Sequence, residues 1–208
     1  MNVRRDAGSI LPEAARRAAR HRGVTVQVDL VERASRGDRD AFATLVRANV
    51  DRCYGLAYRI LRDHHRAQDA TQQAFLGAWR DLPTLREPQR FDAWLHRLVV
   101  HACYVEARTE RRSTAKVLAI RPTAAAPGDQ IGAVGDREML DQAFRTLSPE
   151  HRSVVVLHHH HGYPLAEIAA LLGIPEGTAR SRLHYAVRHL RAELDSAARS
   201  TLIEERPA

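Results

Sequence analysis

The stretch Tyr163–Leu194, YPLAEIAALLGIPEGTARSRLHYAVRHLRAEL, is the most informative part of this chain because it holds two helical patterns separated by a sharp turn. Gly173 ends the first pattern and Pro175 can open the second, which is the arrangement that helix termini favour. The apolar residues of the second pattern recur at helical spacing, at Leu183, Val187, Leu190 and Leu194. This spacing predicts a helix-turn-helix whose second helix enters the major groove of DNA.

The second helix carries polar and basic side chains on the face that its leucines leave free. The residues predicted to reach base edges are Thr178, Arg180, Ser181, Arg182 and His184. Arg188 and Arg191 lie further along, where phosphates are the expected partners. The alternative is a solvated basic helix in a small bundle. We favour DNA because the turn, the small Ala169 and the basic N-terminal face coincide.

Composition and charge narrow the class of protein. The chain has 208 residues, a hydrophobic content of 44% and a formal net charge of +7. This charge points to a polyanionic partner, with simple arginine enrichment as the alternative, and charge alone is weak evidence. Cys53 and Cys103 form no CxxC pair, so we expect reduced core thiols.

No apolar run approaches the ~18 residues of a membrane span, and residues 1–27 lack the apolar centre of a signal peptide. We therefore expect a cytoplasmic protein without membrane insertion.

The remaining pattern predicts an all-α fold of two small helical domains joined by a flexible linker, the C-terminal one containing the helix-turn-helix. No alternating strand pattern competes with the helical ones, and each domain is expected to have its own core. The expected segments are a basic N-terminal extension at 1–27, a helical domain at 28–112, a linker at 113–136, the helix-turn-helix domain at 137–195 and a tail at 196–208. We assign the N-terminal extension no function.

The helix that begins near Phe91 is a second candidate surface for nucleic acid. Positive and planar side chains that could track a backbone and stack on unpaired bases are Arg90, Phe91, Trp94, Arg97, His101 and Arg108. The alternative is that Phe91 and Trp94 belong to the core and that the arginines are solvated, and for Trp94 alone the core is the better interpretation.

The sequence contains no pattern of a catalytic site. It has no P-loop, no nucleophile elbow and no HExxH, so we expect neither an enzyme nor a cofactor. The run His158–His161 could suggest a zinc site or a pH-responsive binding protein. Consecutive histidines on a helix point in different directions, so we interpret the run as a helix end at the negative pole of the dipole, with no metal bound.

Four blocks in order resemble the extracytoplasmic-function group of bacterial RNA polymerase sigma factors. These blocks are DATQQAFLGAW at Asp69–Trp79, FDAWLHRL at Phe91–Leu98, LSPEHR at Leu147–Arg152, and YPLAEIAALLGIPEGTARSRL at Tyr163–Leu183. The resemblance covers about residues 28–194. It departs from the family at His101 and Val105, where an Asn and an Asp are common, and at Gln73, where Glu is frequent.

The resemblance implies a division of roles among the predicted surfaces. It implies that core RNA polymerase is bound by the helix at 66–82, through Asp69, Gln72, Gln73 and Phe75. The segment at 82–112 would melt and read the minus-ten promoter element, and the helix at 175–191 would read the minus-thirty-five element. The resemblance also implies an anti-sigma partner. A stand-alone helix-turn-helix regulator is the alternative.

Overall fold

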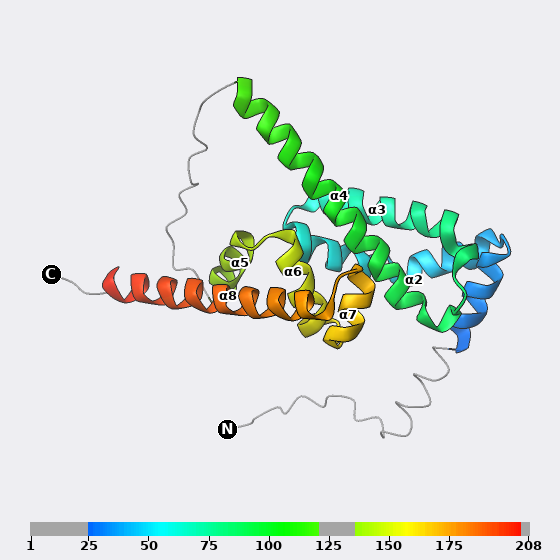
Figure 1. Ribbon diagram of the computed structural model, residues 1–208. Coiled ribbons are helices and arrows are strands. Elements are labelled where there is room, and N and C mark those ends of the chain that lie inside the picture. Colours follow the sequence, from blue (N-terminus) through cyan, green and yellow to red (C-terminus); the bar gives the residue numbers. More distant parts are fainter. Residues whose placement is uncertain (1–24, 121–135, 205–208) are drawn as a thin grey trace, which may run out of the picture.

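The computed structural model describes the backbone of residues 25–120 and 136–204, and the side chains of residues 25–112 and 139–196. Every element within these ranges is helical, which confirms the predicted all-α class (Figure 1). Most of the predicted N-terminal extension and linker falls on residues outside these ranges. None of the described helices combines the length and apolar character needed to cross a membrane.

The helices fall into two groups along the chain, here called the first and second modules. The first module contains a helix at 25–35, α2 (Arg39–Leu61), α3 (His64–Asp81), the 3₁₀ turns η1 (Leu82–Thr84) and η2 (Pro88–Arg90), and α4 (Phe91–Ile120). The second module contains α5 (Asp136–Thr146), α6 (Pro149–Val155), the π-helical turn η3 (Val156–His160), α7 (Leu165–Leu172) and α8 (Glu176–Glu204).

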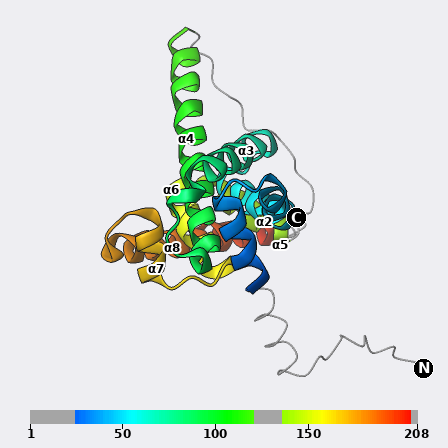
Figure 2. The same cartoon turned by 90° about the vertical axis from the view of Figure 1, so that its right-hand side faces the viewer.

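Three helix ends differ from the predicted segment boundaries. The first helix includes Gln27, whose Nε2 donates to Asp92 Oδ1 at 2.6 Å, so residues 25–27 belong to the fold rather than to the extension. Helix α4 continues to Ile120 and α8 to Glu204, past the expected ends at 112 and 195. Both helices run beyond the body of the molecule at their C-terminal ends (Figure 1), and Figure 2 shows this again for α4. Residues with good helix propensity extend a helix that is already nucleated by packing.

Local side-chain caps explain where several helices begin and end. Asp38 caps α2 by accepting from the backbone N–H groups of residues 40 and 41, and Asp63 caps α3 by accepting from that of residue 66. Ser148 caps α6, with Pro149 in the first turn. Gly162 and Gly173 take left-handed conformations, with φ of 73° and 66°, at the ends of η3 and α7.

The first module packs α2, α3 and α4 closely against one another. The buried face of α3 is almost entirely alanine, which lets its neighbours approach closely; the residues are Ala67, Ala70, Ala74 and Ala78. Cys53 and Cys103 are free and buried in this core, as predicted, and burial raises the pKa of each thiol to about 12.

The expectation of two separate cores is wrong, because one hydrophobic cluster spans both modules. It contains Leu56 and Val99 from the first module together with Val154, Leu157 and Ile168 from the second. A smaller cluster, built around Ala186 and Leu190, belongs to the second module alone. The modules therefore form one closed body in which α6 lies between the first module and α8 (Figure 1).

Candidate nucleic-acid and polymerase interfaces

The helix-turn-helix has the predicted geometry. Gly173 ends α7, and the carbonyl of Pro175 accepts the first backbone hydrogen bonds of α8, from the N–H groups of Thr178 and Ala179. Ala179 and Ala186 face inward and are fully buried. This packing orients the opposite face of α8 toward solvent, which is the orientation that base readout requires.

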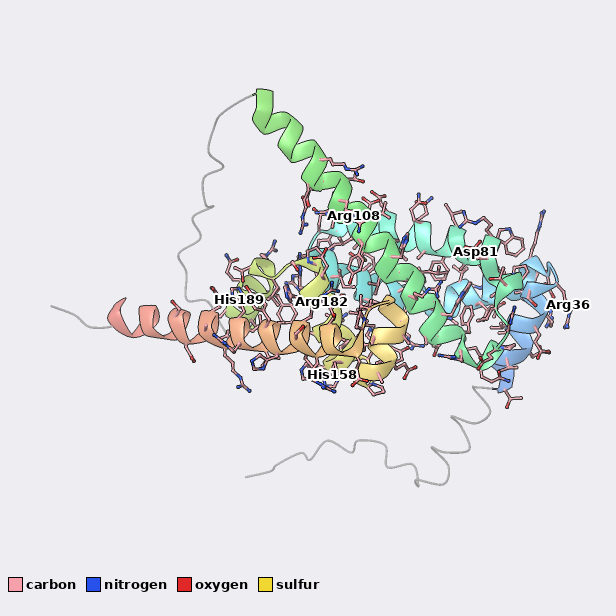
Figure 3. All side chains as sticks on the ribbon, in the orientation of Figure 1. Arg36, Asp81, Arg108, His158, Arg182 and His189 are labelled. Carbon is pink, nitrogen blue, oxygen red and sulfur yellow. The ribbon has the colours of Figure 1, made fainter. Side chains whose placement is uncertain are left out.

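The predicted upstream-element residues occupy that outer face, to different degrees. Those that are exposed are Arg180, Ser181, His184 and Arg188, whereas Thr178 and Arg182 are half-buried. Arg180 donates to Glu176 Oε1 at 2.8 Å within the helix. Arg182 lies on the side of α8 nearer α6 (Figure 3). Burial, followed by the positive charge of Arg182, lowers the pKa of His151 in α6.

The predicted minus-ten residues are placed by η2 and α4. Four of them follow one face of α4 at helical spacing; these are Trp94, Arg97, His101 and Arg108. Arg90, Trp94 and Arg97 line a cavity of about 390 Å³, whereas His101 and Arg108 are exposed further along the helix. The assignment of Phe91 to this surface is wrong. Phe91 is only 1% exposed, so its ring is part of the core and presents no face on which a base could stack.

The other wall of that cavity comes from the second module. Glu167, Ala170 and Leu171 of α7 line it opposite Trp94 and Arg97. Leu171 belongs to the shared core, so α7 is fixed in this position by burial. In the closed molecule the first helix of the helix-turn-helix therefore covers the N-terminal part of the predicted minus-ten surface.

Two polar contacts across the junction accompany the shared core. The Tyr104 hydroxyl lies 2.6 Å from Ser153 Oγ, and the Tyr163 hydroxyl lies 2.9 Å from His96 Nδ1. The His161 ring packs edge-on to that of His96, with centroids 4.5 Å apart. The sequence carries no local signal for the contact between His96 and Tyr163, because the two residues lie 67 positions apart in the chain.

The histidine run is more than the helix end that the sequence indicated. It does lie at the end of a helix, in η3, where His158 Nδ1 lies 3.0 Å from the carbonyl oxygen of Tyr163. His161 instead packs into the junction. Burial is the main cause that lowers the pKa of His96 and of His161 to about 4, so both imidazoles are neutral at physiological pH.

The predicted polymerase-binding helix borders a groove of about 810 Å³ between α2 and α3. Gln72 and Phe75 line this groove, while Asp69 and Gln73 are exposed on α3 but do not line it. Residues that the sequence analysis missed complete it, among them Val50, Leu76 and Trp79, the last of which is 39% exposed and contacts Phe42 edge-on. The sequence did contain a signal for Trp79, because this residue ends the DATQQAFLGAW block.

Comparison with known families matches two segments of the chain. Residues 45–113 match Sigma-70 region 2, and residues 143–192 match Sigma-70 region 4. The first match ends within α4, and the second covers α6, α7 and most of α8. The two matches correspond to the first and second modules.

Similar proteins support the same assignment. The chain is 34% identical to ECF RNA polymerase sigma factor SigL of Mycobacterium tuberculosis over 163 residues, which is 74% of this chain and 91% of SigL. It is 27% identical to ECF RNA polymerase sigma factor SigW of Bacillus subtilis over 176 residues, which is 79% of this chain and 94% of SigW.

Two solved structures share the fold. One is the sigma factor RpoE in complex with the anti-sigma factor NepR from Bartonella quintana, with a TM-score of 0.59, 22% identity and coverage of 74% of this chain and 96% of that one. The other is CnrH in complex with the cytosolic domain of CnrY, with a TM-score of 0.57, 24% identity and coverage of 82% and 98%. The chain belongs to the extracytoplasmic-function group of RNA polymerase sigma factors, which direct core RNA polymerase to specific promoters and initiate transcription there.

Proposed function

We propose that the three surfaces described above divide the work of promoter recognition. The groove between α2 and α3 binds core RNA polymerase, the outer face of α4 captures the melted minus-ten element, and the outer face of α8 reads the upstream element. The polymerase supplies the catalysis, and the chain acts with it in the cytoplasm. The observation that supports this division most strongly is that the groove and the two arginine-bearing faces lie on different helices of one body.

Each surface has the chemistry of its assigned partner. The groove is largely apolar and brings together the exposed side chains of Val50, Leu76 and Trp79, and contiguous apolar patches of this kind mark protein interfaces. The faces of α4 and α8 carry arginines, which bind phosphates and the edges or planes of bases. The solved relatives in complex with NepR and CnrY support an anti-sigma partner for this chain as well.

The closed arrangement adds a step to this function. Leu171 and Glu167 of α7 share a cavity with Trp94 and Arg97, so a base cannot stack on Trp94 until α7 moves away. The second module must therefore separate from the first before the minus-ten element is captured. Binding energy from the melted minus-ten element can shift this equilibrium, because this element binds only the open form.

Titration of core polymerase with fluorescently labelled chain tests the docking surface. Gln72→Ala combined with Trp79→Ala removes a polar and an apolar side chain from the groove, and we expect affinity for core to fall by about tenfold or more. Arg36→Ala, at an exposed position outside the groove, is the matched control and should leave affinity unchanged. Unchanged affinity in the double variant would remove the assignment of the groove.

Transcription in vitro with core polymerase tests the whole proposal. The wild-type chain should give discrete start sites on genomic DNA fragments that core polymerase alone does not give. The groove variant should lose these products in proportion to its loss of core binding. Start sites that persist in the absence of core affinity, or no start sites with bound wild-type chain, would contradict the proposal.

A further inference from the structure

A cluster of arginines lines a cavity at the junction of the modules, on a different side of α4 from the predicted minus-ten face. The cavity has a volume of about 530 Å³. Its arginines come from the α2–α3 corner, from α4 and from α5–α6; they are Arg62, Arg66, Arg111, Arg145 and Arg152. Asp63 and Glu110 are the two carboxylates among its lining residues. We call this cavity the arginine pocket.

The carboxylates near the pocket do not neutralise its charge. Glu110 forms an ion pair with Arg66, and Asp141 Oδ2 lies 2.7 Å from a terminal nitrogen of Arg62. Asp63 accepts a hydrogen bond from the backbone N–H of residue 66, as the cap of α3. Arg152 has no ion-pair partner among the described residues. The pocket therefore keeps a positive surplus.

The buried guanidinium groups are also short of hydrogen-bond acceptors. The Nε atoms of Arg62, Arg66 and Arg152 are buried without a hydrogen-bond partner in the described part of the chain. Arg152 is only 8% exposed, and the Arg62 side chain is 9% exposed. Buried polar groups of folded proteins are almost always hydrogen-bonded, and buried charges are almost always paired. The three arginines that line this one cavity thus carry donors without a protein acceptor, a surplus that suits an anionic ligand.

Electrostatics and backbone geometry agree with this interpretation. Burial, followed by the charges of Arg62 and Arg66, lowers the pKa of Arg152 to about 10. Arg152 nevertheless stays charged at neutral pH, so like charges are held together in the pocket. Arg62 adopts a left-handed backbone conformation, with φ of 58°, which is unusual for a residue other than glycine. This conformation ends α2 and turns the chain into α3, which places Arg62 and Arg66 at one corner of the pocket.

We propose that the arginine pocket binds a small anion that carries two or more phosphate groups. Guanidinium forks bind phosphate oxygens in pairs, and several forks around one cavity match a ligand with several phosphate oxygens. The volume lies within the range of small-molecule sites and exceeds what one phosphate would fill. A DNA backbone is the less favoured occupant, because Arg62 and Arg152 are buried in a cavity rather than displayed on an open face.

Ligand binding in this pocket would favour the closed molecule. Its walls come from both modules, so the complete pocket exists only while α6 rests against α2 and α4. A ligand that binds one conformation stabilises it by mass action. This inference rests on the proposed function. The anion would oppose the opening that exposes the minus-ten surface, and would thus restrain the sigma factor.

Isothermal titration calorimetry on the full chain, at constant ionic strength and pH 7.5, tests the pocket without any step of transcription. The probes are inorganic pyrophosphate, ATP without a divalent cation, and orthophosphate. We expect one pyrophosphate or ATP per chain and much weaker binding of orthophosphate. Arg111→Gln combined with Arg145→Gln changes two exposed residues of the rim, and should weaken pyrophosphate binding by about tenfold or more.

Arg152→Met and a charge-matched control separate a built pocket from general charge attraction. Arg152→Met should abolish binding and the rise in melting temperature that pyrophosphate causes, while the ligand-free variant melts no lower than wild type, because an unpaired buried charge has been removed. Arg36→Gln, far from the pocket and exposed, should bind like wild type. Equal losses in Arg36→Gln and Arg152→Met, or no pyrophosphate binding by the wild-type chain, would overturn the proposal. The proposal would also be overturned if a short DNA duplex bound in a way that requires Arg152 and that pyrophosphate does not inhibit.

Discussion

The two helices proposed to contact DNA, α8 and α4, differ in what covers them. The outer face of α8 is open to solvent at Arg180, Ser181, His184 and Arg188. On α4 the equivalent arginine-bearing face is covered at its N-terminal end by α7, next to Trp94 and Arg97. The second module thus leaves its own proposed DNA-reading face on α8 exposed. Its helix α7 covers part of the proposed minus-ten face on α4 of the first module.

Under the proposed function, the two promoter elements therefore need not be recognised at the same time. Duplex DNA can approach α8 in the closed molecule, whereas an unpaired base reaches α4 only after opening. The shared core around Leu157 and the contact between His96 and Tyr163 decide how easily opening occurs. Variants that change either the junction covering α4 or the exposed face of α8 test this difference.

The largest effect is expected from Leu157→Ala, which removes a fully buried side chain from the core shared by both modules. We expect the free energy of unfolding to fall by about 2–5 kcal/mol. Hydrogen exchange should speed up in α3 and α4 as well as in α6, because the two modules share this core. Leu190→Ala, in the cluster of the second module alone, is the control and should leave exchange in α3 unchanged. Identical exchange in α3 for both variants would show that the modules do not share a core in solution.

Acidification should open the junction through His96 and His161. Their pKa of about 4 in the folded chain lies below the ordinary value of 6.5, so the unfolded or opened chain binds protons more readily. Their contribution to stability is therefore present above about pH 6.5 and is lost as the pH falls toward 4. Melting temperature measured between pH 7.5 and 4.5 should fall less steeply in His96→Gln than in His65→Gln, a variant of an exposed histidine on α3. Parallel curves would contradict this assignment.

Base preference at the upstream element should depend on Arg180 and Arg182. Loss of a bidentate contact to a base costs about 1–3 kcal/mol at one base pair. We expect Arg180→Ala or Arg182→Ala to relax preference at single positions when holoenzyme is selected on a promoter library. Unchanged preference in both variants, whatever happens to overall affinity, would remove α8 as the base-specific element.

A smaller effect is expected from Tyr163→Phe, which removes the hydroxyl that lies 2.9 Å from His96 Nδ1 while keeping the ring. A single hydrogen bond of this kind contributes about 0.5–1.5 kcal/mol. The junction should loosen by that amount, so affinity for a single-stranded minus-ten oligonucleotide should rise a few-fold, while affinity for upstream duplex stays constant. Equal changes for the two DNAs would contradict the idea that only α4 is covered.

The smallest effect concerns Arg188, on the solvent-exposed side of α8 beyond the base-reading residues. Arg188→Ala should weaken all upstream duplexes alike and lower the slope of log affinity against log salt by about one unit. Filter binding over a series of salt concentrations measures the slope. A change of sequence preference instead would place Arg188 among the base-reading residues.

Much of this protein was predictable from its sequence because the signals are local. Helix caps such as Asp38 and Ser148 act within three residues, and the Gly173–Pro175 turn is complete within its own segment. The alanine stripe of α3 and the leucine stripe of α8 follow from helical periodicity. The all-α fold, the helix-turn-helix, the four family blocks and most exposed candidate residues therefore needed no structure.

The features that could not be predicted depend on contacts between residues far apart in the chain. The run from Ser153 to Leu157 is buried on every side, which places α6 between two partners, but periodicity cannot say which partners these are. Three features follow from this position of α6: the burial of Phe91, the covering of Trp94 by α7 and the place of His161 in the junction. The arginine pocket follows from it as well, because Arg62 and Arg152 lie on different modules and share a cavity only when a common core brings them together.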